Sequence, residues 1–433
     1  MKLLVIGNGG REHALVWKLA QSKDVDHIYV APGNGGTAVE DKCQNIDIKS
    51  DDIQALLSFA LEKKIDFTVV GPEIPLSEGI ADLFIEAGLK IFAPVKAAAH
   101  MEASKAFAKE IMAASGVPTA KYRRFTDAEL AKQWVTSQNV PIVVKADGLA
   151  AGKGVTVAQT HAEAIKAINE ALVDRIFGDS GGTVVIEEFL AGEEMSYLVI
   201  TDGETIIPLA SAQDHKAVFD GDKGANTGGM GAYSPAPVIS GEQYDKLVDL
   251  VARPIVEELK KRGISYKGIL YAGLMVSTDG FGGLPNIKVL EYNCRFGDPE
   301  TQVILPRMKS DLLPILMATS QGKLNECQIE WNEDPSVSVV MASGGYPGDY
   351  RKGIEINGIA EADAVEGVKV FHAGTSAKEG KIYTAGGRVL NVTAFGSTLK
   401  EAISKAYKGV ACISFDEMHY RKDIGHKALK RNS

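Results

Sequence analysis

Short apolar runs alternate with helical patterns through the first hundred residues, and this alternation constrains the fold more than any other feature of the chain. The strand-like runs are KLLVIG, HIYVAP, DFTVVGP and LKIFAP. The segments between them carry helical periodicity at residues 10–22, 51–65 and 76–88. Strands that alternate with helices through short loops predict a doubly wound parallel sheet.

The pattern changes twice further along the chain. A helical pattern at residues 104–116 ends at a glycine and leads into a strand, a glycine loop, a helix and a strand up to residue 190. From Ser196 to about Gln321 the strand-like runs lengthen, and the last hundred residues are typical of an antiparallel sheet with one or two helices. We therefore expect a multidomain chain of α/β and α+β units.

Length, charge and cysteine content limit the class of protein. A chain of 433 residues is too long for one core, and 45% hydrophobic with 24% charged residues is ordinary for a globular protein. A net charge of −9 argues against nucleic acid or an anionic membrane as a partner, and no apolar run approaches the length of a membrane-spanning helix. The four cysteines show no paired spacing, and the sequence starts on a strand and a glycine turn instead of a signal peptide. We therefore expect a cytoplasmic protein without a zinc site.

The first glycine loop, VIGNGGREHA, follows the first strand and opens the first helix. Glycines let the backbone approach a phosphate there, and the helix N-terminus offers free N–H groups. A dinucleotide fingerprint needs a third glycine where Glu12 and His13 stand, so a nicotinamide cofactor is disfavoured and a smaller phosphate, helped by Arg11, fits better. The alternative is that these glycines only make a tight turn. Two later loops, APGNGG and GPEIPLSEG, follow strands of the same predicted sheet and so face the same crevice.

A second glycine loop, VVKADGLAAGKGV, carries two lysines. Lys145 ends an apolar strand and Lys153 lies in the loop, which is not a Walker loop because no Ser or Thr follows Lys153. We interpret the loop as a flap over a triphosphate with Lys145 beneath it; the alternative is a plain hairpin with solvated lysines. The segment VVIEEFLAGEEMS then places adjacent carboxylates after a strand, which suits a purine edge and ribose hydroxyls but is a weak signal alone.

These pieces occur in one order along the chain. A helix lysine (Lys105), the strand-end lysine with its flap, EEFLAGEE, QDHK, NTGGMGAYSP and EYNCRFGDPETQ together resemble an ATP-grasp ligase. Within that superfamily GGREHA, APGN, GPEIPL and RFGDPE closely resemble the phosphoribosylamine–glycine ligase family, also called the glycinamide ribonucleotide synthetases. The resemblance covers essentially the whole chain, including GYP, HAGT and GGRVL near its end.

The resemblance implies a domain order. It implies a Rossmann-like substrate-binding domain, a small ATP-grasp subdomain with the glycine-rich flap, a large ATP-grasp subdomain with a metal site, and a small mixed or antiparallel α+β domain. Their expected limits are residues 1–104, 105–193, 194–325 and 326–433.

The resemblance also implies a reaction, the ATP-dependent ligation of glycine to 5-phosphoribosylamine in purine biosynthesis. It would pass through glycyl phosphate and give glycinamide ribonucleotide, ADP and phosphate. The implied partners are these small molecules with ATP and Mg²⁺ or Mn²⁺, and we expect a monomer.

The resemblance further implies roles for individual residues. Those implied for the nucleotide are Lys105, Lys145, Gly152, Lys153, Gly154, Glu187, Glu188, Leu190 and Glu194, the last at the ribose. Those implied for the substrates are Gly9, Gly10, Arg11, Asn34, Glu73, Asp214 and Arg295. Catalytic roles fall to Arg295, Asp214 and Lys216, and metal ligation falls to Glu291 and Asn293.

The charge-rich stretch after the apolar run IKVL suits the implied metal role. Glu291 and Asn293 stand two apart on one strand, so both point to the same face and offer hard oxygen ligands to Mg²⁺. Arg295 follows on that face, where it can steady a phosphoryl group or the glycine carboxylate. Cys294 faces the other way, which predicts packing.

Two positions depart from the family pattern, and three other classes of protein remain as alternatives. Ala217 stands where a basic residue is expected and bears on a phosphate or substrate contact, whereas Ala225 replaces an expected proline and affects loop rigidity only. The alternatives are another ATP-dependent carboxylate–amine ligase such as a purine-pathway carboxylase, a nucleotide sensor without turnover, and a dehydrogenase. A sensor has no need of Glu291, Asn293 and Arg295, and a dehydrogenase would need the missing glycine.

Overall fold

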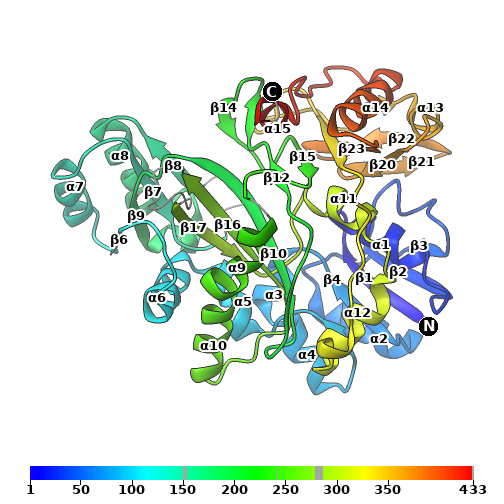
Figure 1. Ribbon diagram of the computed structural model, residues 1–433, viewed down its shortest axis with the longest axis horizontal. Helices are drawn as coiled ribbons and strands as arrows, with labels where there is room; N and C mark the ends of the chain where they lie inside the picture. Colours follow the sequence, from blue (N-terminus) through cyan, green and yellow to red (C-terminus); the bar gives the residue numbers. More distant parts are fainter. Residues whose placement is uncertain (150–153, 240, 278–285, 432–433) are drawn as a thin grey trace.

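The N-terminal region folds as the predicted doubly wound sheet. The computed structural model describes residues 1–149, 154–239, 241–277 and 286–431 (Figure 1). Five parallel strands lie in the order β3-β2-β1-β4-β5. Their bounds are β1 Lys2–Gly7, β2 His27–Pro32, β3 Cys43–Asn45, β4 Phe67–Val70 and β5 Ile91–Phe92. The order reverses between β1 and β4, so the loops after these two strands meet in one crevice.

Helices cover both faces of this sheet. Alternate residues of β1 point to opposite sides: Leu4 and Ile6 pack against α2 (Ile53–Lys63) and α4 (Ile80–Glu86), while Leu3 and Val5 pack against α1 (Gly10–Ala20) and α12 (Leu312–Gln321). The single helix predicted at residues 76–88 is wrong. Gly79 adopts φ +94° and separates α3 (Glu73–Glu78) from α4, because that left-handed conformation ends a helix.

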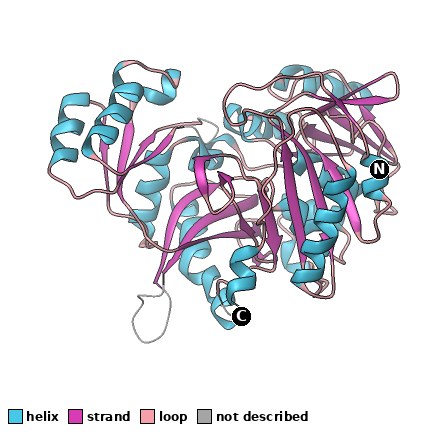
Figure 2. Ribbon diagram, turned by 90° about the horizontal axis from the view of Figure 1, so that it is seen from above, coloured by secondary structure: helices cyan, strands magenta, loops and turns pink. Residues whose placement is uncertain are grey.

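Two antiparallel sheets follow in the central part of the chain. The first has the order β6-β9-β7-β8 and forms a lobe at the end of the molecule away from the N-terminus (Figure 2). Its strands and helices are β6 Tyr122–Phe125, β7 Ile142–Ala146, β8 Val155–Ala158, β9 Val184–Glu188, α7 Ala128–Thr136 and α8 His161–Ile168. The second has the order β11-β10-β16-β17, with bounds β10 Glu193–Thr201, β11 Ile206–Pro208, β16 Gly268–Ser277 and β17 Asn286–Asn293.

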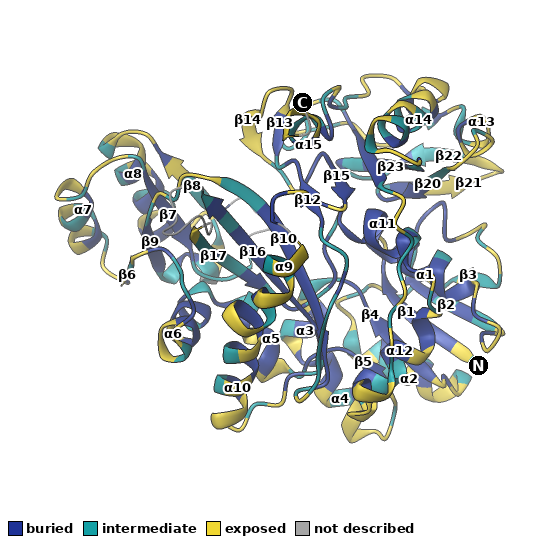
Figure 3. Ribbon diagram, viewed as in Figure 1, coloured by how far each residue is buried: buried dark blue, intermediate teal, exposed yellow. Residues whose placement is uncertain are grey.

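Helices line the outer side of the second central sheet. They are α5 Lys96–Ala103, α6 Lys105–Ser115, α9 Gly241–Leu247 and α10 Arg253–Lys261. Helix α6 begins where predicted because Ser104 accepts a hydrogen bond from the Phe107 amide, and it ends at Gly116 in a left-handed conformation. Figure 3 shows the expected division, with buried strands in the sheets and exposed outer faces on the helices.

The C-terminal region contains the predicted antiparallel sheet and helices. The sheet has the order β12-β15-β18-β23-β20, and its first two strands come from the middle of the chain, so β15 pairs with β18. The bounds are β12 Gln213–Asp214, β15 Gly231–Ser234, β18 Ser336–Ala342, β20 Val368–His372 and β23 Arg388–Phe395. The remaining elements are β13 Ala217–Phe219, β14 Lys223–Asn226, β19 Glu355–Ile356, β21 Thr375–Lys378, β22 Lys381–Thr384, α11 Thr301–Ile304, α13 Ile359–Asp363, α14 Leu399–Cys412 and α15 His426–Arg431.

The predicted fold class is therefore confirmed: a parallel N-terminal sheet, two antiparallel central sheets and an antiparallel C-terminal sheet with helices. The limits expected for the four units stay a prediction. Among the described residues, no helix has both the length and the apolar character needed to span a membrane.

Candidate functional site

A pocket of about 520 Å³ collects side chains from all of these regions, and its size is that of a small-molecule site. Its walls come from the loops after β1 and β4, from α6, β7 and β9, from β17 and the loop behind it, and from the C-terminal sheet. The residues implied by the resemblance that line it are Gly9, Arg11, Glu73, Lys105, Lys145, Gly154, Glu187, Asp214, Lys216, Glu291, Asn293 and Arg295. Gly152 and Lys153 lie outside the described residues.

One end of the pocket is rich in lysine. Lys145 at the end of β7 and Lys109 on α6 both bind the buried carboxylate of Glu187, each with an N–O distance of 3.0 Å. Burial lowers the pKa of Lys109 to about 8, although Glu187 acts in the opposite direction. Lys105, one helical turn before Lys109, donates to the Gly148 carbonyl at 2.9 Å, and burial lowers its pKa too. Two ammonium groups on one carboxylate, with Lys105 lining the same end of the pocket, leave a positive surplus, which suits an anionic ligand.

A second charged group lies across the pocket on and beyond β12. Lys216 pairs with Glu194 at 2.7 Å, and although burial opposes it, Glu194 and Asp214 raise the pKa of Lys216. Burial raises the pKa of Asp214 to about 7. A carboxyl group that titrates near neutral pH can take up or release a proton during a reaction.

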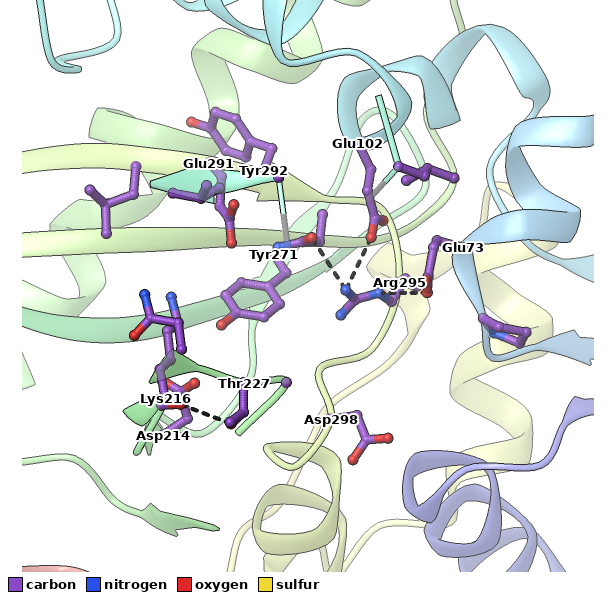
Figure 4. Close-up of a pocket in the computed structure, with 18 of the residues that line it drawn as sticks. Glu73, Glu102, Asp214, Lys216, Thr227, Tyr271, Glu291, Tyr292, Arg295 and Asp298 are labelled. Atoms are coloured by element: carbon purple, nitrogen blue, oxygen red, sulfur yellow. Dashed lines mark hydrogen bonds and ion pairs between the residues drawn. The ribbon is translucent and has the colours of Figure 1, made fainter. Parts of the chain in front are cut away.

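Glu291 on β17 lines the pocket (Figure 4), within reach of the charges of Lys145, Lys216 and Arg295. Burial works to raise its pKa, but the charges of Lys216, Lys145 and other nearby cations lower it, so the carboxylate stays ionised. Within the described residues its oxygens take part in no hydrogen bond or ion pair. Asn293, two residues on along β17, accepts a hydrogen bond from Arg295 at 3.3 Å.

These oxygens fit a divalent cation. Carboxylate and amide oxygens are the ligands that Mg²⁺ prefers, and Glu291 holds a negative charge that the described part of the chain leaves without a direct partner. Among the described residues there is no group of three or more His, Cys, Asp or Glu that could hold a metal unaided. A cation here would therefore need further ligands from a bound phosphate or from water.

The opposite end of the pocket is built from arginines and carboxylates. Arg295 Nη2 lies 3.0 Å from Glu102 Oε1, and Arg295 Nε lies 3.6 Å from Glu73 Oε2, so both carboxylates converge on one guanidinium (Figure 4). Burial works to lower the pKa of Arg295, but Glu102 and Glu73 raise it, and the group stays charged. Burial raises the pKa of Glu102. Cys294, which was predicted to pack, is buried in the core beside this group.

Arg388 of the C-terminal sheet also lines the arginine–carboxylate end of the pocket. Arg388 at the start of β23 donates to the carbonyls of Asp298 and Gly228, at 2.7 and 2.6 Å, and pairs with the Asp298 carboxylate at 3.2 Å. Burial works to raise the pKa of Asp298, and Arg388 lowers it. Arg11 on α1 donates to the Phe296 carbonyl at 3.1 Å. The loop after β17 is therefore fixed from both the N-terminal and the C-terminal regions.

Two residues implied as substrate contacts lie outside the pocket lining. Asn34 is buried and donates to the carbonyls of Asn8 and His372, at 3.0 and 2.8 Å, so it ties the first glycine loop to β20. Gly10 allows close packing instead of ligand approach, because a Cβ there would lie 2.3 Å from Asn391 Nδ2 on β23. Glycine and asparagine in these loops thus hold the N-terminal region against the C-terminal sheet.

Three residues implied for the nucleotide also do not line the pocket. Glu188 accepts hydrogen bonds from the Lys121 amide at 3.0 Å and from Lys288 at 2.7 Å. Leu190 lies just after β9, and Glu194 contacts the pocket through Lys216.

The lining residues that were given no role from the sequence include Glu102, Lys109, Asp298 and Arg388. Asp298 and Arg388 lie within the motifs RFGDPE and GGRVL, so the signal was present without a role attached. Lys109 lies four residues after Lys105, a spacing that puts both on one helix face. Nothing in the local pattern singles out Glu102 at the end of α5.

Sequence comparison identifies the family. The models for the N domain, the ATP-grasp (A) domain and the C domain of phosphoribosylglycinamide synthetase match residues 1–102, 103–301 and 336–427. The chain belongs to the phosphoribosylglycinamide synthetase family. The resemblance drawn from the motifs is thereby confirmed.

Full-length relatives agree with this family. The chain is 52% identical over 432 residues to a phosphoribosylamine–glycine ligase of Yersinia pestis, covering 100% of both chains. It is 53% identical over 432 residues to the protein of that name from Escherichia coli K12, covering 100% of this chain and 99% of that one.

Solved structures share the same architecture. A crystal structure of phosphoribosylamine–glycine ligase from Thermotoga maritima matches with a TM-score of 0.83 at 32% identity, covering 98% of this chain and 100% of that chain. N5-carboxyaminoimidazole ribonucleotide synthetase from the same organism matches with a TM-score of 0.63 at 18% identity, covering 96% and 99%. The second match shows a shared fold only.

Proposed function

We propose that this member of the phosphoribosylglycinamide synthetase family ligates glycine to 5-phosphoribosylamine at the expense of ATP, giving glycinamide ribonucleotide, ADP and phosphate in purine biosynthesis. The observation that carries the proposal is one pocket in which a lysine-rich end and an arginine–carboxylate end meet at Glu291. Two anions, the triphosphate and the glycine carboxylate, must come together for this reaction. Cations are therefore needed at both ends of the pocket.

The lysine-rich end is the proposed nucleotide site. Lys105 and Lys145 bind the phosphates, and the flap with Gly152, Lys153 and Gly154 covers them. Glu187, Glu188, Leu190 and Glu194 are the remaining proposed contacts, with Glu194 at the ribose. The two lysines paired with Glu187, together with Lys105 beside them on the pocket wall, support this half of the proposal.

Glu291 and Asn293 are the proposed ligands of Mg²⁺ or Mn²⁺. When bound, the cation supplies positive charge that offsets the charge of the transferring phosphoryl group. Within the described residues the ionised carboxylate of Glu291 has no direct partner and belongs to no group of three or more metal-ligating side chains, which suits a cation that takes its other ligands from phosphate and water.

The arginine–carboxylate end is the proposed site for the other two substrates. Arg295 orients the glycine carboxylate toward ATP, whose terminal phosphoryl group is transferred to it, giving glycyl phosphate and ADP. The amine of 5-phosphoribosylamine then attacks the acyl carbon and displaces phosphate. Asp214 receives the proton that the amine loses, with Lys216 beside it, and its pKa of about 7 suits that task. The proposed contacts of 5-phosphoribosylamine are Gly9, Arg11 and Glu73, with Gly10 and Asn34 as supports of the same loops.

The remaining parts of the proposal concern organisation. We propose a substrate-binding domain at residues 1–104, ATP-grasp subdomains at 105–193 and 194–325, and a C-terminal domain at 326–433, in a cytoplasmic monomer. Limited proteolysis and size-exclusion chromatography with light scattering test these limits and the monomer.

The deciding experiment measures ADP release from ATP and Mg²⁺ with glycine and freshly prepared 5-phosphoribosylamine, together or omitted singly. We expect ADP to form only when both are present, in a 1:1 ratio with an amide product detected by mass spectrometry. ADP release that ignores glycine or the amine would overturn the proposed substrates.

A further inference from the structure

Lys109 borders the proposed nucleotide end of the pocket, yet its ammonium group forms hydrogen bonds with other side chains of the protein. Its side chain is 2% exposed. It donates to Glu187 Oε2 at 3.0 Å and to Thr119 Oγ1 at 2.7 Å, and it lies 5.6 Å from the centre of the Tyr122 ring. Two of its three ammonium protons are donated to these oxygens, and the Tyr122 ring is a neighbour of the charge. Lys109 is therefore held by the protein and almost fully enclosed.

Two chains of contacts lead from Lys109 to adjacent positions on β17. The Thr119 hydroxyl in turn donates a hydrogen bond to the Val289 carbonyl at 2.6 Å. Glu187 binds Lys145 on its other side at 3.0 Å, and Lys145 donates to the Leu290 carbonyl at 3.2 Å. Both chains end immediately before Glu291, so they form a ring that joins α6, β9, β7 and β17.

The ring also determines the net charge of Lys109, Glu187 and Lys145 together. Glu187 carries one negative charge and contacts two lysines, so the group as a whole is positive by one unit. If Lys109 lost its charge, Glu187 and Lys145 would form a neutral pair, and Lys145 would be drawn toward Glu187 instead of toward an anion in the pocket.

We infer that Lys109 is a positioning residue for nucleotide binding, which acts through Glu187 and Thr119 to keep the ammonium group of Lys145 available to an anion in the pocket and aligned with the strand of Glu291. The inference rests on the proposed function only in taking the lysine-rich end as the nucleotide site. It does not depend on the identity of the other two substrates.

The main test replaces Lys109 by methionine, which keeps the length of the side chain and removes its charge. Calorimetric titration with the non-hydrolysable nucleotide AMP-PNP and Mg²⁺ measures affinity without turnover. We expect Lys109→Met to raise the Kd for AMP-PNP and the KM for ATP by about 10- to 100-fold, the range for hydrogen bonds to charged groups, while the KM for glycine stays constant. An unchanged Kd, or an equal rise in the KM for glycine, would overturn the inference.

Two matched variants of Thr119 test the chain of contacts that runs from Lys109 through Thr119 to Val289. They also provide a test if the Lys109 variant does not fold. Thr119→Val keeps the shape and removes the hydroxyl, whereas Thr119→Ser keeps the hydroxyl. We expect Val to raise the Kd for AMP-PNP by roughly 3- to 10-fold, the range for one hydrogen bond, and Ser to restore it to near the wild-type value. Equal affinities for the two variants, with thermal unfolding that shows both folded, would contradict the inference.

The outcome is separable from that of the proposed function. A wild-type protein that binds AMP-PNP but makes no amide product would overturn the ligase proposal. A weaker Kd for Lys109→Met in the same titrations would still support the positioning role.

Discussion

The two ends of the pocket are charged in different ways. At the lysine-rich end, Lys109 and Lys145 share one buried carboxylate, that of Glu187, and Lys105 donates to the Gly148 carbonyl. At the other end, Arg295 faces two carboxylates and Arg388 faces Asp298. One end therefore carries a positive surplus, and the other presents both signs of charge close together.

This difference matches the proposed ligands. A triphosphate is strongly anionic and calls for surplus positive charge, whereas glycine is a zwitterion and calls for a cation and an anion side by side. The ends also differ in chemistry, because burial can lower the pKa of lysine into the working range while arginine stays charged. The comparison thus predicts that variants at the two ends separate the kinetics of ATP from those of glycine.

The largest expected effect lies at Glu291, which serves both ends. Glu291→Gln keeps the shape and removes the charge, so we expect turnover to fall by at least about 10³-fold, as for loss of a central electrostatic group. The measurements are steady-state ADP release and circular dichroism, with a native spectrum as the control for folding. Near-normal turnover would show that the metal ligands lie elsewhere.

The next effect distinguishes the glycine end. Arg295→Lys keeps a positive charge but loses the fork whose Nη2 faces Glu102 at 3.0 Å while its Nε faces Glu73 at 3.6 Å. We expect the KM for glycine to rise by about 10- to 100-fold, with the KM for ATP unchanged. Substrate titrations check both constants, and Lys109→Met is the matched control with the opposite pattern. A parallel rise in both KM values would mean that the ends do not act separately.

The pH dependence of kcat/KM should distinguish the lysine-rich end from the arginine–carboxylate end, because a buried lysine can lose its proton while arginine stays charged. Because the pKa of Lys109 is lowered to about 8, kcat/KM for ATP is expected to fall above that pH by about tenfold per unit, and Lys109→Met is expected to flatten the limb. The free energy of unfolding should instead rise with pH over part of this range. The unfolded chain keeps this proton up to pH 10.5, so between about 8 and 10.5 it binds more protons, and the contribution of Lys109 to stability rises with pH.

Two measurements check these opposite trends: initial rates between pH 7 and 9, and urea unfolding of wild type and Lys109→Met across the same range and above it. An alkaline limb that is identical in the two proteins would assign the proton to another group, and Lys105 is the next candidate because its pKa is lowered as well.

Local patterns predicted the parts of the site that neighbouring residues determine. Lys145 at a strand end and the alternation of Glu291 with Asn293 follow from strand geometry, and the structure has both as expected. Arg388 reaches the pocket only because β18 and β23 join a sheet begun by β12 and β15, and no local pattern contains that pairing. Asn34 has a structural use that its motif did not indicate. Its loop motif suited a ligand, but its amide is used by the carbonyls of Asn8 and His372.

The smallest expected effect tests the contact that Arg388 of the C-terminal sheet makes with the loop after β17. Arg388→Lys keeps the charge near Asp298 but cannot reach the carbonyls of Asp298 and Gly228 together with the carboxylate. We expect the free energy of unfolding to fall by about 1–3 kcal/mol and the KM for 5-phosphoribosylamine to rise a few-fold, while the KM for ATP stays constant. Urea unfolding and substrate titrations measure these quantities. A change confined to the KM for ATP would contradict the division, because Arg388 belongs to the arginine–carboxylate end and contacts none of the lysines of the other.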